Sequence, residues 1–242
     1  MKNDHPFDVP YRQRHLKGDR RHGRLSDAIL FIHGAGKSDR LRFSILRSAL
    51  EARGLGSTVF DCIGHGETGG LIEESSLLDR TQQAEAVIEE QGLCEPLIVF
   101  GASMGAYNAI KLTQNRRVDS LILTVPGVYT PQAYEVPFGP RFSSIIRQER
   151  SWVDTDAWEL LARFTGRLLV IAAENDSVIP AEIPNRLIES AERSCWKKLH
   201  VVKGAEHTRL IPSPVEQPVA FGELMTDIIS CIDAPSHVLK PR

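Results

Sequence analysis

Short apolar runs alternate along the chain with longer segments in which apolar residues recur every three or four positions. The apolar runs predict buried strands of a parallel sheet, at 28–33, 57–62, 97–101, 121–125, 167–173 and 198–202. The longer segments predict helices at 40–53, 76–91, 104–114, 184–193 and 216–231. This alternation predicts an α/β protein with a mostly parallel, twisted sheet and helices on both of its faces.

One connection is far longer than the others, because about forty residues separate the strand that ends at 125 from the one that begins at 167. Its aromatic residues are Tyr129, Tyr134, Phe138, Phe142, Trp152 and Trp158. One interpretation is a short lid insertion at about 127–165 that covers a substrate pocket. The candidate pocket residues are then Tyr129, Phe138, Trp152 and Trp158. The other interpretation is that these side chains only pack an additional helix onto the core.

Composition limits the classes of protein to consider. With 242 residues, 42% of them hydrophobic, the chain is expected to form one domain over 1–242. A formal net charge of -2 offers no excess of positive charge for phosphates, so no nucleic-acid partner is expected. The most basic stretch, 11–24, is predicted to be a solvated hairpin.

The sequence also predicts a cytoplasmic protein without a membrane span. The N-terminal segment lacks the apolar run of a signal peptide, and no segment reaches the length of about 18 apolar residues that spans a bilayer. The four cysteines lack the spacing of a zinc or redox site, so no metal is predicted. They are expected to be reduced and mostly buried, and they are Cys62, Cys94, Cys195 and Cys231.

The candidate nucleophile lies between a predicted strand and a predicted helix, in Gly101-Ala102-Ser103-Met104-Gly105. In a GxSxG motif at such a turn, the serine hydroxyl stands out above the sheet. Gly101 and Gly105 leave room for a strained turn and for close packing of the helix. The alternative is a glycine-rich turn in which Ser103 only caps the helix.

A serine hydroxyl needs a histidine as general base, and that histidine needs a carboxylate to orient it. In this topology both partners follow the serine, the acid before the histidine, in loops after later strands. Asp176 follows the strand at 167–173, and His207 follows the last strand. Glu174 is the second candidate for the carboxylate, and Asp154 or Asp156 could approach from the long connection.

Acyl transfer also needs donors for the negative oxygen of the tetrahedral intermediate. The backbone amides of Met104 and Ala35 are predicted to supply them, Ala35 from the loop after the first strand. The supporting residues of that loop are His33, Gly34 and Gly36. Because His33 and His65 precede Ser103 in the chain, they are interpreted as loop-shaping residues and not as the base.

The first loop continues with Gly36-Lys37-Ser38, which resembles the end of a phosphate-binding P-loop. That motif requires a glycine five positions before Gly36, where Phe31 stands, so the pattern fails. A nucleotide triphosphatase is the best alternative outside the hydrolases. Lys37 is interpreted as a solvent-facing loop residue and Ser38 as the start of a helix.

Five segments together resemble the α/β-hydrolase superfamily: HGAGKS at 33–38, DCIGHGET at 61–68, GASMG at 101–105, END followed by VIP at 174–180, and GAEH at 204–207. The segment 61–68 is similar to the DxxGHGxS loop of small esterases, lipases and serine aminopeptidase-like members, with Thr68 in place of the usual serine. The resemblance covers about 28–231. It implies additional antiparallel strands at the N-terminus, no cofactor and an acyl-serine intermediate.

These features predict a serine hydrolase that cleaves a carboxylic ester or thioester of a small to medium, largely apolar acyl substrate. An acyltransferase or biosynthetic thioesterase would use the same residues with another acceptor in place of water. An amidase that resembles proline iminopeptidases would need Glu135 or Glu149 to hold a substrate amine. A non-catalytic protein would keep the fold as a ligand pocket.

Overall fold

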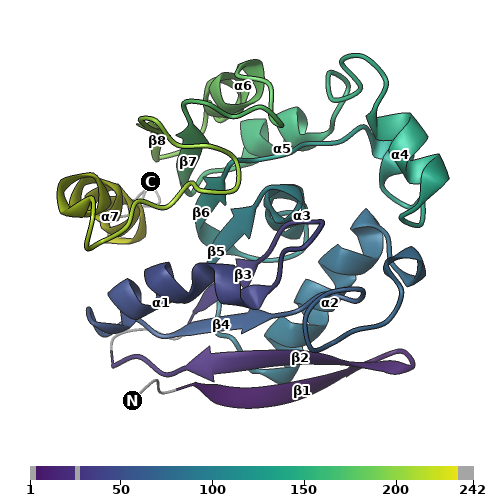
Figure 1. Cartoon of the computed structure of the whole chain (residues 1–242), viewed down its shortest axis with the longest axis horizontal. Helices are drawn as coiled ribbons and strands as arrows, with labels where there is room; N and C mark the ends of the chain where they lie inside the picture. Colours follow the sequence, from purple (N-terminus) through teal and green to yellow (C-terminus); the bar gives the residue numbers. More distant parts are fainter. Residues whose placement is uncertain (1–3, 25–27, 234–242) are drawn as a thin grey trace, which may run out of the picture.

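An eight-stranded sheet runs through the computed structural model of this chain, which describes residues 4–24 and 28–233 (Figure 1). The strands are β1 (His5–Tyr11), β2 (Arg14–Arg21), β3 (Ile29–Ile32), β4 (Ser57–Phe60), β5 (Leu97–Ala102), β6 (Val118–Thr124), β7 (Arg167–Ala173) and β8 (Trp196–Val202). They lie in the order β1-β2-β4-β3-β5-β6-β7-β8. β1 pairs with β2 and β2 with β4 in antiparallel fashion, and all other pairs are parallel.

Helices cover both faces of this sheet. On one face the apolar side chains of α1 (Ser44–Glu51) and α7 (Pro218–Asp233) form a core with the strands. The helices that pack on the other face are α2 (Leu77–Glu90), α3 (Met104–Leu112), α5 (Ala157–Arg163) and α6 (Glu182–Ser190). The remaining elements are α4 (Pro140–Ile146) and the 3-10 turns η1 (Arg40–Phe43), η2 (Ile72–Glu74) and η3 (Pro131–Ala133). The predicted α/β class with a mostly parallel sheet is confirmed.

The helix expected at 40–53 is divided into two parts. The side chain of Asp39 accepts a hydrogen bond from the Leu41 amide, which caps the tight turn η1, and α1 begins only at Ser44. Gly54, at φ +80°, follows the end of α1 in the left-handed conformation that commonly terminates helices. The helix start is therefore set by Asp39 and not by Ser38 as predicted.

The N-terminal basic stretch forms the strand β2 of the hairpin, but it is not fully solvated as predicted. Val9 and Leu16 are completely buried in the core, and the Arg21 side chain is only 2% exposed. Arg21 donates from Nε to Asp4 at 2.5 Å. The β1–β2 hairpin therefore forms one edge of the sheet, because β2 pairs with β4. These two strands are the additional antiparallel strands that the resemblance implies.

The long connection between β6 and β7 contains η3, α4 and α5. Phe138 and Phe142 are 5% and 4% exposed and belong to the core on the α3 face. The partly buried rings of Tyr129, Trp152 and Trp158 pack against that core. This packing matches the second interpretation of the aromatic residues, in which they attach the segment to the core.

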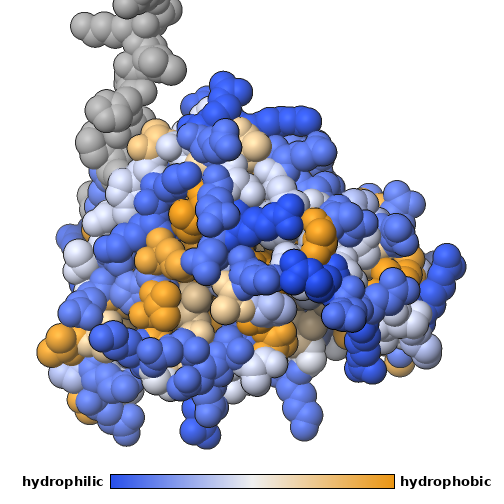
Figure 2. Space-filling model, turned by 90° about the horizontal axis from the view of Figure 1, so that it is seen from above, coloured by the Kyte–Doolittle hydropathy of each residue, from blue (hydrophilic) through white to orange (hydrophobic). Residues whose placement is uncertain are grey.

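The expectation that the cysteines are mostly buried is wrong for Cys94 and Cys195, which are exposed in turns that precede β5 and β8. Cys62 and Cys231 are buried, and all four thiols are free. Over residues 4–24 and 28–233, none of the helices combines the length and the apolar character needed to cross a membrane. On the face seen in Figure 2, hydrophobic residues lie in small groups among hydrophilic ones.

Candidate active site

The turn at Ser103 joins β5 to α3 in a conformation that is rare for a residue with a side chain. Ser103 has φ 50° and ψ -116° and stands between Ala102, the end of β5, and Met104, the start of α3. Its amide donates to the carbonyl of Thr124 at 2.9 Å, and its carbonyl accepts from the Gly127 amide at 3.1 Å. Backbone strain of this kind persists where the surroundings fix it, and it occurs most often at functional sites.

Two glycines of the motif are required by close backbone contacts. A Cβ atom at Gly105 would lie 2.3 Å from the carbonyl oxygen of Ile32, and one at Gly101 would lie 2.5 Å from the carbonyl oxygen of Gly105. No side chain fits at such distances. The absence of side chains therefore lets the start of α3 approach the end of β3, which brings Ser103 beside the loop that follows β3.

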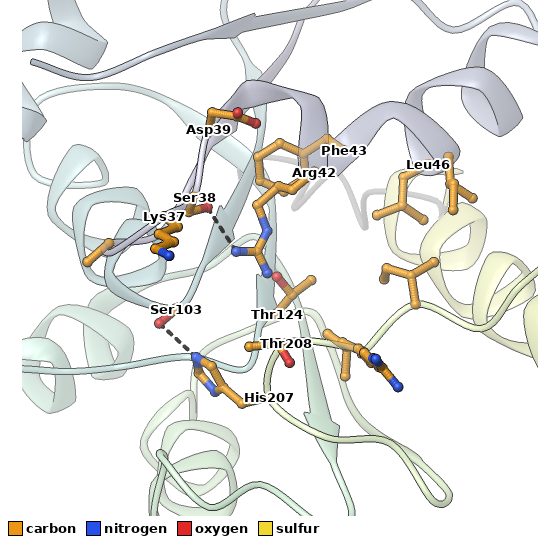
Figure 3. A pocket seen from close by; sticks show the side chains of 15 residues that line it. Lys37, Ser38, Asp39, Arg42, Phe43, Leu46, Ser103, Thr124, His207 and Thr208 are labelled. Atoms are coloured by element: carbon orange, nitrogen blue, oxygen red, sulfur yellow. Dashed lines mark hydrogen bonds between the residues drawn. The ribbon is translucent and has the colours of Figure 1, made fainter. Parts of the chain in front are cut away.

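The structure brings Ser103, His207 and Asp176 together although they are far apart in the sequence. Nε2 of His207 lies 3.1 Å from Oγ of Ser103 (Figure 3). Nδ1 of the same ring lies 2.9 Å from Oδ2 and 3.1 Å from Oδ1 of Asp176. The side chains of His207 and Asp176 are only 14% and 9% exposed. The two loops meet because parallel neighbours β7 and β8 end at the same edge of the sheet.

The Asp176 carboxylate is itself held in place by backbone amides. Its Oδ1 accepts hydrogen bonds from Val178 at 2.8 Å and from Ile179 at 2.9 Å. Such bonds fix the carboxylate in the orientation that directs the His207 ring toward Ser103. The sequence signal for this arrangement is the short turn END-SVIP after β7.

The other candidate carboxylates accept hydrogen bonds from groups other than His207. Glu174 accepts a hydrogen bond from the Gly204 amide at 2.8 Å. Asp154 accepts from the Thr130 hydroxyl at 3.1 Å. Asp156 accepts from Tyr107 and Lys111, each at 2.7 Å. The geometry therefore selects Asp176 as the partner of His207.

His33 is completely buried under the first loop and holds a neutral imidazole. Its Nε2 accepts from the Cys62 amide at 3.0 Å, and its Nδ1 lies 2.7 Å from the Gly34 carbonyl, to which it donates. Burial, followed by the positive charge of Arg80, holds the pKa of His33 well below its usual value. Both ring nitrogens are thus engaged in shaping the loop.

His65 also shapes this loop. Its Nδ1 lies 2.9 Å from the carbonyl of Ser38, and its ring meets that of His33 edge-on at 4.7 Å. Burial and then Arg80 lower the pKa of His65. Thr68, which replaces the serine of the related loop, keeps the hydroxyl: it donates to the Asp61 carbonyl at 2.7 Å and accepts from the Lys17 amide at 2.8 Å.

A buried arginine that the sequence analysis did not single out supports the first loop from below. Arg80, in α2, is completely buried, and its Nη2 donates to the carbonyl oxygens of His33 and, at 3.2 Å, of Gly34. Its Nη1 lies 3.4 Å from Nε2 of His65. Among the described residues no carboxylate forms an ion pair with Arg80. The sequence offered no signal for it, because one arginine in a helical pattern is typical of a solvated face.

The two predicted oxyanion donors border the nucleophile. Met104 is the first residue of α3, so its amide has no carbonyl partner within the helix. Ala35 lines the same cavity as Ser103 and His207. Within the described part of the chain, the Ala35 amide donates to no other residue. Both amides are therefore available to an oxygen placed beside Ser103.

The cavity at Ser103 has a volume of about 510 Å³ and opens between the loop after β3, α1 and the loop after β8 (Figure 3). Its cationic residues are Lys37, Arg42 and Arg209, and its one lining carboxylate among the described residues is Asp39. Its apolar side chains are Ala35, Phe43, Ile45, Leu46, Leu210 and Ile211. Lys37 is exposed, as the sequence interpretation expected, and it also lines the rim of this cavity.

The predicted pocket residues of the long connection do not line this cavity. The residues concerned are Tyr129, Phe138, Trp152 and Trp158. Tyr129 meets the rings of Tyr107 and Phe142, and Trp152 meets Trp158 at 6.4 Å. These side chains contact each other and the core because the connection packs on the α3 face, whereas the cavity opens toward α1. No group of three or more His, Cys, Asp or Glu in residues 4–24 and 28–233 is arranged to hold a metal ion.

A protein-family model matches more than half of this chain. Residues 23–153 match the family model described as "Serine aminopeptidase, S33". An uncharacterized protein of Mycobacterium tuberculosis, from strains H37Rv and CDC 1551, is 28% identical over 189 residues. That match covers 76% of this chain but only 64% of the relative, so the chain spans less than two thirds of the length of the curated relatives it matches.

Solved structures share the fold at low sequence identity. Est1E of Butyrivibrio proteoclasticus with bound ferulic acid has a TM-score of 0.70 at 15% identity, covering 92% of this chain and 99% of that one. The monoacylglycerol lipase of Paleococcus ferrophilus has a TM-score of 0.66 at 18% identity, with 89% and 97% covered. The thioesterase domain of the curacin biosynthetic pathway has a TM-score of 0.67 at 16% identity, with 94% and 99% covered.

Proposed function

Because this chain belongs to the α/β-hydrolase family described as "Serine aminopeptidase, S33", we propose that it is a serine hydrolase that cleaves a carboxylic ester or thioester through an acyl-serine intermediate. The observation that carries the proposal is the hydrogen-bonded chain from Ser103 through His207 to Asp176, built on a strained turn. A general base within hydrogen-bond reach, itself oriented by a carboxylate, is what an unactivated serine requires.

In the proposed mechanism, Oγ of Ser103 attacks the substrate carbonyl while Nε2 of His207 takes the hydroxyl proton. Asp176 stabilises the imidazolium that forms. The amides of Ala35 and Met104 bind the negative oxygen of the tetrahedral intermediate. His207 then returns the proton to the departing alcohol or thiol. A water molecule next attacks the acyl-serine while His207 takes its proton, and His207 passes this proton to Oγ of Ser103 as the carboxylic acid leaves.

Two observations favour an ester or thioester as the bond that is cleaved: the solved structures with the same fold and the charge of the cavity. The solved neighbours include Est1E with bound ferulic acid, a monoacylglycerol lipase and a thioesterase domain, and the names of the last two refer to acyl groups bound to oxygen or sulfur. An aminopeptidase would need a carboxylate to hold the substrate ammonium. Glu135 and Glu149 are exposed and do not line the cavity. Asp39 lines it, but its carboxylate caps the Leu41 amide, and the cations that line the cavity repel an ammonium group. Ester or thioester cleavage is therefore favoured over release of an amino acid.

The test combines covalent labelling with turnover. A fluorophosphonate probe is expected to label the wild type at Ser103, and p-nitrophenyl butyrate is expected to be hydrolysed. Ser103→Ala should lose the label and at least about 10³-fold in kcat, because the nucleophile is gone and only the oxyanion donors act. Ser144→Ala, which removes an exposed hydroxyl of α4, is the matched control and should retain both signals. Undiminished turnover by Ser103→Ala would refute the proposal.

A further inference from the structure

Positive charge gathers at the cavity from two loops that are distant in the sequence. Lys37 and Arg42 come from the segment after β3, and Arg209 comes from the segment after β8. Within the part of the chain that the structure describes, none of these three cations forms an ion pair with a carboxylate. Among the described residues only one carboxylate, that of Asp39, lines the same cavity, so the lining carries an excess of positive charge.

Arg42 differs clearly from its neighbours on the same segment. Arg40 pairs with Asp61 and, at 3.0 Å, with Asp19, and Arg47 pairs with Asp19. Arg42 instead donates from Nη1 to the Ser38 hydroxyl at 2.9 Å. A guanidinium carries five N–H donors, so most of its donors stay available to a ligand.

The Arg42 guanidinium borders the nucleophile. A Cβ atom at Gly34 would lie 3.1 Å from Cβ of Ser103 and 3.7 Å from Nη1 of Arg42, so both side chains limit the same small space. In Figure 3 the Arg42 side chain extends from η1 into the cavity, on the side where Ser103 and Thr124 lie. A substrate held at Ser103 is therefore within reach of this cation.

The acidic groups nearby do not neutralise the cluster. Asp39 lines the cavity, but its carboxylate caps the Leu41 amide at 2.9 Å and points away from Ser103 in Figure 3. Asp176 contacts the opposite side of the His207 ring. Arg42 is an exposed residue, so its guanidinium is accessible to an anion that enters the cavity from solvent.

We propose that this cavity recognises a substrate ester or thioester that carries a negatively charged group, a carboxylate or a phosphate, which Arg42 binds with help from Lys37 and Arg209. The planar guanidinium suits both anions, because each can accept two parallel hydrogen bonds from it. The apolar side chains of Phe43, Leu46 and Leu210 fit a short hydrocarbon portion between the anion and the scissile bond. This inference rests on the proposed hydrolase function, and it replaces the largely apolar substrate expected from the sequence.

The first experiment compares esters that differ only in charge. The acyl pair is the p-nitrophenyl monoester of glutaric acid and its methyl ester, and the leaving-group pair is p-(butyryloxy)benzoate and its methyl ester. In at least one pair, the wild type is expected to have a kcat/KM that is on the order of tenfold or more higher for the charged member. The pair that shows the preference identifies which side of the scissile bond carries the anion.

Substitutions of Arg42 test whether this residue causes the preference for charged esters. Arg42→Met is expected to remove most of the ratio between charged and neutral esters, and Arg42→Lys should restore part of it because the charge is kept. Arg53→Met is the matched control, since Arg53 ends the same segment, is exposed and lies outside the cavity, where it donates to the Ala49 carbonyl. Added salt should reduce the ratio in the wild type, because it screens the attraction. Thermal unfolding of each variant checks that it is folded.

A second readout does not depend on turnover. Calorimetry should detect binding of glutarate or inorganic phosphate to the wild type, no comparable binding of the neutral analogue glutaramide, and weaker anion binding to Arg42→Met. Tighter binding of phosphate than of glutarate would identify a substrate that carries a phosphate. Tighter binding of glutarate would identify a substrate that carries a carboxylate. Equal kcat/KM for charged and neutral esters, both abolished by Ser103→Ala, would overturn this inference and leave the proposed function intact. Anion binding without hydrolysis of any ester would refute the hydrolase function and retain the anion site.

Discussion

At the scale of single residues, the carboxylate of Asp176 is shared between the His207 ring and the amides of Val178 and Ile179. Asp176→Asn is therefore expected to lower kcat for p-nitrophenyl butyrate on the order of 10⁴-fold. The physical reason is that an amide cannot stabilise the imidazolium and favours the wrong tautomer of the ring. Steady-state kinetics measure the loss, and KM should change little, because Asp176 does not line the cavity.

Glu174→Gln is the matched control for this prediction. Glu174 stands two residues before Asp176, but its carboxylate accepts from the Gly204 amide and does not contact His207. The glutamine can still accept that hydrogen bond, so activity should stay near that of the wild type. An equal loss in both variants would contradict the assignment of the carboxylate.

The residues of the Ser–His–Asp arrangement could be located from the sequence, but the cations of the cavity could not. Ser103, Asp176 and His207 each follow a strand closely, and parallel strands bring such positions to one edge of the sheet. Arg42 belongs to the 3-10 turn η1 and Arg209 to the loop after β8, and no local pattern encodes that these two segments meet. The charge of the cavity is therefore a property of the tertiary fold alone.

At the scale of elements, α2 supports the first loop through Arg80, whose guanidinium binds the carbonyls of His33 and Gly34. Arg80→Met is expected to lower kcat about tenfold or more, because the loop that carries the Ala35 amide loses its anchor. The loss of stability should be smaller than for most substitutions that truncate a buried side chain. Two carbonyls lose a partner, but a buried cation without an acidic partner is also removed.

Kinetics with p-nitrophenyl butyrate and urea unfolding separate these two effects. Gln82→Met is the control on the same helix, because Gln82 faces the hairpin, where it accepts from Tyr11 at 3.1 Å. It should leave kcat unchanged. A variant of Arg80 that loses stability but keeps the wild-type kcat would show that Arg80 only supports folding.

The strands could be predicted better than the segments between them. The parallel strands β3 to β7 are largely buried, so they stand out as apolar runs whose positions the structure reproduces within a few residues, whereas in β8 only Val202 is buried. The division of 40–53 depends on one side-chain hydrogen bond of Asp39, which periodicity does not detect. The aromatic residues at 129–158 were ambiguous because a ring that packs on a core and a ring that lines a pocket produce the same pattern.

At the scale of the whole molecule, the hairpin is attached to the sheet by charged groups as well as by backbone pairing. Asp19 in β2 pairs with Arg47 in α1 and with Arg40 in η1, and Arg40 continues to Asp61 after β4. This network connects the edge of the sheet to the segment that forms one wall of the cavity. Such buried pairs are costly to break singly, because the remaining charge is left without its partner.

Buried histidines make the stability of the whole molecule depend on pH. The pKa values of His33 and His65 are lowered from 6.5 by burial and by Arg80, the pKa of His33 well below it, so the folded state binds fewer protons than the unfolded chain. Below pH 6.5 the free energy of unfolding should therefore fall, with a slope that approaches about 1.4 kcal/mol per pH unit for His33 and is smaller for His65. Urea unfolding between pH 7 and pH 5.5 measures this slope before most carboxylates protonate. His33→Gln removes one titrating ring and should show a clearly shallower slope, whereas an unchanged slope would contradict this cause.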